Sequence, residues 1–309
     1  MKILIVMDEG IGNMINLTPA IRGIKNIMPE SQITVFGKKP AIELISGHEL
    51  IYEAIDTPES DSSYDIGILA IFYSGYAARF ADIIKNQCKA LYYIKANKHI
   101  PEYLSFMKAA EFFGYKGGLP VPFWMWEFSD YAGNADQKQI GLCNTSQAGW
   151  DMKRWDKYPE LAWALHDSGY QVVLIGGKYE ADVFKASLYP ESVVNCLGKY
   201  SMQKTVDLLS LMDIVVGNDC GIARVAAAMN KPTIFLFGSS NIPKNAPLGD
   251  NVSIIDKRLP CAPCIYTDRI GKCEKYRCME AISVADIVAE VRSRQNGKDS
   301  QSKDKEVQR

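Results

Sequence analysis

Histidine is scarce in this sequence. The 309 residues include three, His48, His99 and His166, and none of them falls in a recognisable motif. Imidazole is the usual proton acceptor of nucleophilic hydrolases and the commonest metal ligand in proteins. The chain also lacks the G-x-S-x-G turn of the α/β hydrolases and the G-x-x-x-x-G-K-[ST] phosphate loop. These absences disfavour a histidine-dependent hydrolase and a mononuclear zinc enzyme.

An excess of one charge and a long apolar run are absent as well. The chain has 35 Lys and Arg against 36 Asp and Glu, whereas bulk nucleic-acid binding needs a basic excess, so we expect no nucleic-acid partner. No apolar stretch approaches the roughly 18 residues of a membrane span. The opening M-K-I-L-I-V-M is followed at once by Asp8 and Glu9, which is typical of a first strand rather than a signal peptide. We therefore expect a cytoplasmic protein.

Short apolar runs alternate with helical patterns along most of the chain, which predicts parallel sheets with helices on both faces. The runs that we expect to be strands are residues 2–7, 32–37, 51–55, 65–72 and 90–94 in the first half, and 140–146, 171–177, 192–198, 213–219 and 233–238 in the second. Residues 127–140 are small and polar, as in a linker. We expect an α/β protein with two Rossmann-like domains, 1–135 and 136–292, that face each other across a cleft. The polar segment 293–309 is predicted to be disordered.

The turn E-G-I-G-N-M-I at residues 9–15 follows the first strand. Gly10 and Gly12 give the G-x-G of a dinucleotide-binding turn, but the third glycine of that fingerprint would fall at Ile15. No acidic residue stands convincingly where the ribose of such a cofactor would be held, so a nicotinamide site is disfavoured. A tight strand-to-helix turn with Gly12 close to another group is compatible with any function.

A second strand-to-helix turn has the sequence N-D-C-G-I-A-R. A strand runs into Asn218 and Asp219, and a helix begins at Cys220 and Gly221. The free backbone N–H groups at a helix start, with the positive end of its dipole, form a site for phosphate. Asp219 is also a suitable N-cap, so both interpretations stay open from this turn alone. Its place at a strand end in the second half favours the ligand.

Two further loops of the second half also follow strands. The first carries hydroxyls and cations that suit a diphosphate, at Thr145, Ser146, Lys153 and Arg154. Its two cations are equally compatible with solvated surface charges. The second loop leads through Gly177 to Glu180, which would accept hydrogen bonds from ribose hydroxyls or, alternatively, only begin a surface helix.

Four of the eight cysteines crowd into 18 residues, at Cys261, Cys264, Cys273 and Cys278. The spacing is C-x₂-C, then eight residues, then C-x₄-C. Four thiolates in one short loop can close a tetrahedral zinc site, and this site would be structural because four sulfurs leave no open position. Reduced or redox-sensitive thiols are the alternative.

These stretches, taken in order, resemble glycosyltransferase family 9, whose best-known members are the ADP-heptose–lipopolysaccharide heptosyltransferases. The stretches that carry the resemblance are G-I-G-N-M-I-N-L-T-P-A-I-R-G-I-K (10–25), K-R-W (153–155), V-V-L-I-G-G (172–177), G-N-D-C-G-I-A-R-V-A-A-A-M-N-K-P-T-I-F-L-F-G (217–238), C-A-P-C (261–264) and I-S-V-A-D-I (282–287). Single motifs are modest, but their order and spacing are specific. The resemblance covers the chain to about residue 290.

The resemblance implies a GT-B fold whose N-terminal half takes the acceptor and whose C-terminal half takes the nucleotide sugar. It implies transfer with inversion at the anomeric carbon, without an obligatory metal at the transfer site. The expected donor is a nucleotide-diphosphate sugar, ADP-linked and with heptose as the candidate sugar. The expected acceptor is a cell-surface glycan or glycolipid such as the lipopolysaccharide core.

The resemblance also implies roles for single residues. Lys153 would meet the donor phosphate, Glu180 the ribose, and Asp219 with Cys220 and Gly221 the diphosphate. Members of the family often have a threonine and a histidine where Cys220 and Arg224 stand here. An arginine at that position still pairs with phosphate.

One departure concerns the catalytic base. The resemblance implies an aspartate directly after the second glycine of the first turn, where this chain has Asn13. An amide does not take up the proton of the acceptor hydroxyl, and a general base typically contributes about 10²–10⁴ in rate. Three explanations remain: Asp8 or Glu9 is the base, Asn13 only positions the acceptor, or catalysis is lost.

We favour an active transferase. The alternative is a catalytically impaired protein that binds a sugar nucleotide and serves as a partner or regulator. A nucleotide-sugar epimerase on the same fold is disfavoured, because the chain lacks the histidine and acid set that such an enzyme uses.

The segment 94–118 carries a run of basic residues, at Lys95, Lys98, Lys108 and Lys116. These charges would meet an anionic, phosphate-bearing glycolipid and bring the protein to the inner face of the membrane as a peripheral protein. They would equally keep a helix soluble.

Overall fold

The computed structural model describes residues 1–306 except 60, 72–77, 96, 134–135, 147–149, 266, 268, 270–271 and 274–275. The chain forms two compact units. The first consists of Met1–Ser129, Ser201–Asp207 and Pro243–Leu248, and the second of Asp130–Tyr200, Leu208–Ile242 and Gly249–Arg309. Two short segments of the second half of the sequence therefore belong to the first unit.

The first unit is built on a five-stranded parallel sheet in the order β3-β2-β1-β4-β5. Its strands are β1 (Lys2–Met7), β2 (Gln32–Gly37), β3 (Glu53–Ile55), β4 (Ile66–Ile71) and β5 (Leu91–Tyr93). β1 is the central strand, and all its residues after Lys2 are buried. A strand with apolar side chains on both faces needs cover on both faces, which is why helices flank the sheet.

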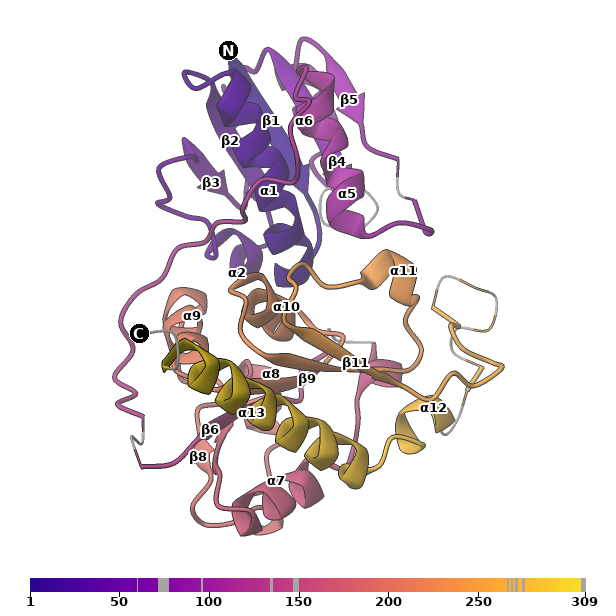
Figure 1. The fold of residues 1–309 in the computed structure, drawn as a ribbon. Helices are drawn as coiled ribbons and strands as arrows, with labels where there is room; N and C mark the ends of the chain where they lie inside the picture. Colours follow the sequence, from indigo (N-terminus) through magenta and orange to yellow (C-terminus); the bar gives the residue numbers. More distant parts are fainter. Residues whose placement is uncertain are drawn as a thin grey trace. The chain divides into compact units, whose positions relative to one another are not determined.

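Within the described residues of Met1–Ser129, the helices are α1 (Ile11–Ile27), α2 (Lys39–Ile42), α4 (Ala81–Gln87), α5 (Glu102–Phe106) and α6 (Lys108–Phe112). α1 packs beside α5 and α6 (Figure 1). The approach is close because of Gly23: a Cβ atom there would lie 2.9 Å from the Cβ of Ala110. Pro19 cannot donate to the carbonyl of Ile15, and the Thr18 hydroxyl donates to that oxygen instead, at 2.8 Å.

The second unit is built on a six-stranded parallel sheet in the order β11-β10-β9-β6-β7-β8. Its strands are β6 (Gln139–Cys143), β7 (Gln171–Leu174), β8 (Val194–Asn195), β9 (Ile214–Asn218), β10 (Thr233–Phe237) and β11 (Val252–Asp256). The remaining helices are η1 (Asp151–Lys153), α7 (Tyr158–Asp167), α8 (Lys178–Asp182), η2 (Ala186–Leu188), α9 (Met202–Ser210), α10 (Gly221–Ala228), α11 (Ile242–Asn245), α12 (Arg277–Glu280) and α13 (Val284–Glu306).

The predicted strands are confirmed, most of them one to a few residues shorter than expected. Two features of the second unit differ from prediction. β11 was missed, because it is a sheet edge whose residues are half-buried and show no clear alternation. The segment predicted to be disordered from residue 293 continues α13 as far as Glu306. Ile287 and Val291 anchor the first turns of this helix in the core, and extending a formed helix is easier than starting one.

Both sheets reverse their strand order beside the first strand of the unit. β2 and β4 flank β1 in the first unit, and β7 and β9 flank β6 in the second. Ligands of open parallel sheets bind at the carboxyl ends of the strands where the order reverses. In this chain those ends lead to Asp8 and Glu9 in the first unit, and to Asn144 and Asp219 in the second.

Candidate active site

Asp219, at the end of β9, is a buried carboxylate that holds two cations. Lys153 donates to its Oδ2 at 2.9 Å, Arg224 donates to its Oδ1 at 2.6 Å, and the Ser240 hydroxyl donates to Oδ2 at 2.6 Å. Burial disfavours the charge, but Arg224 and Lys153 hold the pKa of Asp219 well below its usual range. Asp219 is not the N-cap of α10, because that position is Cys220. Its effect is to fix Lys153 and Arg224 at the start of α10.

The N-terminus of α10 follows this carboxylate directly. Cys220 is extended, and the helix begins at Gly221. α10 lies close to its own sheet because both surfaces are small there: a Cβ atom at Gly217 would lie 2.8 Å from that of Ala223. The N–H groups of the first helical turn, which have no partner within the helix, and the two cations together make a site for an anion.

The loop after β6 is tied to the end of β9. The Asn218 amide donates to Asn144 Oδ1 at 3.3 Å, and the Tyr158 hydroxyl lies 3.2 Å from Asn218 Oδ1. Arg154 donates to the carbonyls of Asn144 and Ser146, both at 3.4 Å. Within the part of the chain that the structure describes, the buried Ser146 hydroxyl has no hydrogen-bond partner. Among the described residues, the loop thus contains a buried hydroxyl whose hydrogen-bonding capacity is unused.

Glu180 lies at the start of α8, after β7, and only 8% of its surface is exposed. Its Oε2 accepts from the backbone N–H of Gly177 at 3.0 Å, and its Oε1 accepts from Arg154 at 3.0 Å. The guanidinium of Arg154 also lies over the ring of Tyr179, 4.8 Å from its centroid. Glu180 therefore lies at a helix start, as the second of the two interpretations of this loop predicted. It is, however, a buried and ion-paired carboxylate rather than a surface charge.

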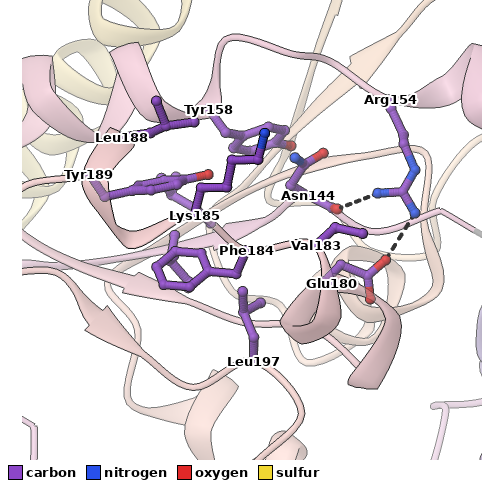
Figure 2. Close-up of a pocket in the computed structure, with 12 residues that line it drawn as sticks. Asn144, Arg154, Tyr158, Glu180, Val183, Phe184, Lys185, Leu188, Tyr189 and Leu197 are labelled. Atoms are coloured by element: carbon purple, nitrogen blue, oxygen red, sulfur yellow. Dashed lines mark hydrogen bonds and ion pairs between the residues drawn. The ribbon is translucent and has the colours of Figure 1, made fainter.

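A pocket of about 270 Å³ opens beside this ion pair (Figure 2). Its lining consists of Leu142, Asn144, Arg154, Tyr158, Leu174, Glu180, Val183, Phe184, Lys185, Leu188, Tyr189 and Leu197. Figure 2 shows Arg154 and Glu180 together on one side and the rings of Phe184 and Tyr189 on the other; the two ring centroids lie 5.2 Å apart. An apolar body with a few polar groups at one side suits a flat ring that carries polar substituents.

In the first unit, charged residues gather near the carboxyl end of β1. Asp8 is fully buried, and Lys38 Nζ lies 3.9 Å from its Oδ1. Glu102 and Lys244 form a second, largely buried ion pair at 3.5 Å. Burial raises the pKa of the half-buried Glu9. The positive charges of Lys38 and Lys244 lower this pKa, whereas the negative charges of Asp8 and Glu102 raise it further. The pKa of Glu9 therefore lies above the usual range of a glutamate.

The first turn of α1 lies next to Glu9. Gly12 is buried there, and Asn13 is partly exposed, with its backbone N–H donating to the Gly10 carbonyl at 3.0 Å. Asn13 therefore lies at the same end of the sheet as Asp8 and Glu9.

The structure divides the predicted site residues between the two units. Gly12 and Asn13 lie in the first unit with Asp8 and Glu9. The second unit contains Thr145, Ser146, Lys153, Arg154, Gly177, Glu180, Asp219, Cys220, Gly221 and Arg224. Lys153 and Arg154 are not solvated surface charges, since their side chains are 20% and 15% exposed and both are ion-paired.

Some residues of these clusters were not predicted. Ser240 follows β10, so the rule that strand ends converge would have found it. Tyr158 and the Glu102–Lys244 pair had no sequence signal, because helices and loops far along the chain bring them in.

The four clustered cysteines line one cavity of about 460 Å³, together with Arg269, Lys272 and Arg277. Burial raises the pKa of Cys264, and it raises the pKa of Cys278 to about 11. Among the residues that the structure describes, no three histidine, cysteine, aspartate or glutamate side chains lie close enough together to hold a metal ion. The cysteines share a cavity without forming a ready ligand set.

None of the helices in the described ranges combines the length and the apolar character that crossing a bilayer requires.

Comparison with known proteins gives consistent results. The model of glycosyltransferase family 9 (heptosyltransferase) matches residues 94–274, more than half of the chain. Lipooligosaccharide heptosyltransferase 2 of Haemophilus influenzae is 36% identical over 124 residues, which cover 38% of this chain. That match spans 36% of the relative's own length, about a third.

Solved structures show the same fold. ADP-heptose LPS heptosyltransferase II of Escherichia coli has a TM-score of 0.70 at 20% identity, covering 95% of this chain and 98% of that chain. The iron-containing dodecameric glycosyltransferase TibC of enterotoxigenic E. coli has a TM-score of 0.64 at 14% identity, covering 96% of this chain and 76% of that one. The fold is therefore two parallel-sheet α/β domains of the GT-B type, as the resemblance implied. With a match over most of its length and this fold, the chain belongs to glycosyltransferase family 9, the heptosyltransferase family.

Proposed function

We propose that the protein is a glycosyltransferase that moves a sugar from a nucleotide-diphosphate sugar to a lipopolysaccharide-type glycolipid. The observation that carries this proposal is the arrangement around Asp219, which fixes Lys153 and Arg224 at the N-terminus of α10. Two cations, a helix start and the Ser146 hydroxyl at a reversal of strand order suit a diphosphate. Family membership supports the same assignment.

The donor is proposed to be an ADP-linked heptose. Its diphosphate would lie at Lys153 and the start of α10, where fixed positive charge stabilises the leaving nucleotide as negative charge grows on it. Its ribose would lie at Glu180, whose carboxylate is held in place by Arg154 and Gly177. Its base would enter the pocket lined by Phe184 and Tyr189, which has room for a purine. The similarity to lipooligosaccharide heptosyltransferase 2 and to ADP-heptose LPS heptosyltransferase II supports heptose and ADP.

The reaction is proposed to invert the anomeric carbon. The acceptor hydroxyl attacks that carbon, the bond from it to the diphosphate oxygen breaks, and the nucleoside diphosphate leaves with the electron pair. The hydroxyl proton goes to Glu9. We choose Glu9 over Asp8 because Asp8 is fully buried against Lys38, whereas Glu9 is partly accessible and burial raises its pKa above the usual range of a glutamate. Asn13, an amide, would orient the acceptor hydroxyl.

The acceptor is proposed to approach the first unit along residues 94–118, at the inner face of the membrane. Lys95, Lys98 and Lys116 are exposed there, whereas Lys108 is paired with Glu111 at 2.6 Å. Exposed ammonium groups would attract the phosphates of a lipid-linked glycan.

A structural metal at the four cysteines is a separate proposal, and the transfer does not depend on it. A divalent ion with four thiolates carries a net charge of −2, and Arg269, Lys272 and Arg277 line the same cavity and offset that charge. Holding the ion would require the thiols to come closer together than they lie here.

Donor turnover tests the proposed function. Purified protein would be given ADP-, UDP-, GDP- and CMP-sugars, and nucleotide release would be measured with and without a crude lipid-linked glycan fraction. Acceptor-dependent release from ADP-heptose is the expected result. Tight donor binding without release, even with the acceptor present, would contradict it and favour a protein that only binds sugar nucleotides.

A further inference from the structure

The four clustered cysteines lie on one segment of the second unit, residues 261–278, which we call the cysteine segment. Near its start, the backbone N–H of Cys264 donates to the carbonyl of Ser239 at 3.1 Å. At its end, Cys278 packs on Gly238, where a Cβ atom would lie 2.8 Å from the cysteine sulfur. Both ends of the cysteine segment therefore contact the two residues that directly follow β10.

Ser239 also contacts η1, the short turn that carries Lys153. Its hydroxyl donates to the carbonyl of Met152 at 3.2 Å, and Ser239 is buried. The carbonyls of Trp150 and Asp151 accept from N–H groups of the turn itself, at 3.0 and 2.9 Å. A 3₁₀ turn of three residues has few hydrogen bonds of its own, and their geometry is poor. The bond from Ser239 therefore helps to fix the backbone directly before Lys153.

The chain after Lys153 is held by residues that directly follow the cysteine segment. The indole N–H of Trp155 donates to the carbonyl of Ile282 at 3.1 Å, and both residues are fully buried. Lys157 donates to the carbonyl of Glu280 at 2.7 Å. Lys153 thus lies between two anchors, and both anchors involve the cysteine segment or its neighbours.

The end of β10 also holds the partner of Lys153. Ser240, the residue after Ser239, donates its hydroxyl to Asp219 Oδ2 at 2.6 Å, and Lys153 donates to the same oxygen at 2.9 Å. Two consecutive serines therefore fix both members of this ion pair. Ser239 fixes the backbone beside the cation, and Ser240 fixes the carboxylate. The position of the Lys153 ammonium group consequently depends on how the cysteine segment packs on the end of β10.

We propose that Ser239 is a positioning residue for the transfer reaction, which transmits the packing of the cysteine segment to Lys153, so that a change at the cavity thiols alters donor affinity. The inference rests on the proposed function, in which Lys153 binds the donor diphosphate. It gives the four cysteines an effect on the donor site without requiring that they touch the donor.

The first test is the affinity for ADP, measured by isothermal titration calorimetry. Ser239→Ala removes the hydrogen bond to Met152, so we expect the Kd for ADP to rise by about 2- to 10-fold. Ser239→Thr keeps the hydroxyl, and the cavity that Ser239 lines has room for the added methyl group, so the Kd should stay near that of the wild type.

Thr233→Val is the matched control. Thr233 lies at the other end of β10, and its hydroxyl also donates to a backbone carbonyl, that of Lys231, at 2.9 Å. Thr233 is fully buried, so the substitution removes a comparable hydrogen bond from the same strand. The Kd for ADP should not change. A rise equal to that of Ser239→Ala would contradict a specific role for Ser239.

A double-mutant cycle distinguishes positioning from a general structural role. If Ser239 acts through Lys153, Ser239→Ala should cause no further loss of ADP affinity in a Lys153→Met background. An equal loss in the wild-type and Lys153→Met backgrounds, or no loss in either, would overturn the inference.

The cysteine segment is tested with iodoacetamide, whose carbon is attacked by a thiolate with loss of iodide. Alkylation should weaken ADP binding to the wild type and have no further effect on Lys153→Met. The triple variant Cys261→Ser, Cys264→Ser, Cys273→Ser should be insensitive to the reagent, and mass spectrometry would identify the modified thiols. A loss of affinity that persists in the triple variant would assign the effect to other cysteines and contradict the inference.

Nucleotide release separates this inference from the proposed function. An ADP affinity that depends on Ser239 only when Lys153 is present, without transfer from any donor, would support the positioning role and overturn the proposed function. Acceptor-dependent release from ADP-heptose, with an ADP affinity that Ser239→Ala leaves unchanged, would overturn the inference alone. A wild-type protein that binds no ADP would overturn both.

Discussion

Lys153 donates a hydrogen bond of 2.9 Å to Asp219, and this contact joins the segment after β6 to the carboxyl end of β9. The same carboxylate receives Arg224 at 2.6 Å. A side chain on a short 3₁₀ turn and a side chain on α10 are thus held at one place by a single buried acid. Several consequences can be measured.

Asp219→Asn should destabilise the second unit. The substitution removes the charge that compensates the buried Arg224, and breaking a buried pair in this way costs about 3–5 kcal/mol. Urea unfolding at neutral pH would measure the loss. Because the pKa of Asp219 is lowered on folding, its contribution is present above the ordinary value of 3.8 and is lost as the pH falls below it. The difference between wild type and variant should therefore shrink in acid, and a difference that grows in acid would contradict this account.

Lys153→Met should weaken donor binding. A hydrogen bond to a charged group contributes about 1.5–3 kcal/mol, which corresponds to a loss of about 10- to 150-fold in affinity for the nucleotide sugar. Isothermal titration calorimetry with ADP would measure it. Lys138→Met is the control, since Lys138 is a lysine of the same unit that pairs with Asp213 but has 65% of its side chain exposed. Equal losses in both variants would argue against a phosphate contact.

Glu9→Gln should slow acceptor-dependent release by about 10²–10⁴ and leave donor binding unchanged. Adding Asn13→Asp in the Glu9→Gln background restores a carboxylate to the first turn of α1, so part of the lost rate should return. Rates under donor saturation would be compared for the single and double variants. A Glu9→Gln enzyme with the rate of the wild type would show that another group takes the proton.

Leu188→Trp should block the nucleoside pocket. Leu188 lines the cavity and is 49% exposed, so the larger side chain can enter the pocket without disturbing the core. We expect ADP to bind at least about tenfold more weakly, while inhibition by inorganic pyrophosphate stays unchanged because the anion site is separate. Weaker binding of both ligands, or of neither, would place the base elsewhere.

The cysteine cavity should bind one zinc ion per chain if the proposed structural site exists. Elemental analysis after reconstitution would measure it, and the Cys261→Ser and Cys264→Ser variants should lose the metal. Cys88→Ser is the control, because Cys88 is a free cysteine of the first unit, outside the cavity. Protein that stays metal-free and keeps its stability would identify the cysteines as reduced thiols.

The sequence predicted which strand ends carry the candidate site residues, because parallel strands bring their carboxyl ends together. Asp219, Lys153 and Glu180 were chosen for that reason, and the structure places Lys153 and Arg224 on Asp219 and Arg154 on Glu180. Contacts made by helices are different, since their partners depend on how distant segments pack. The sequence around Glu102 does not indicate its ion pair with Lys244. The sequence likewise does not indicate that the Tyr158 hydroxyl lies 3.2 Å from Asn218. The edge strand β11 was not predicted, because its residues are only partly buried and its sequence shows no clear alternation of apolar and polar residues.

Lys153 and Arg224 each pair with Asp219, and this pairing affects the entropy of donor binding. Long cationic side chains usually lose rotamer freedom when they close on a ligand, at about 0.5–1.5 kcal/mol each. In this protein folding has already restricted both, because Asp219 holds them through hydrogen bonds within the chain. The diphosphate therefore binds two cations that are already in place. Less of its attraction to these cations is spent on ordering their side chains, and more contributes to affinity.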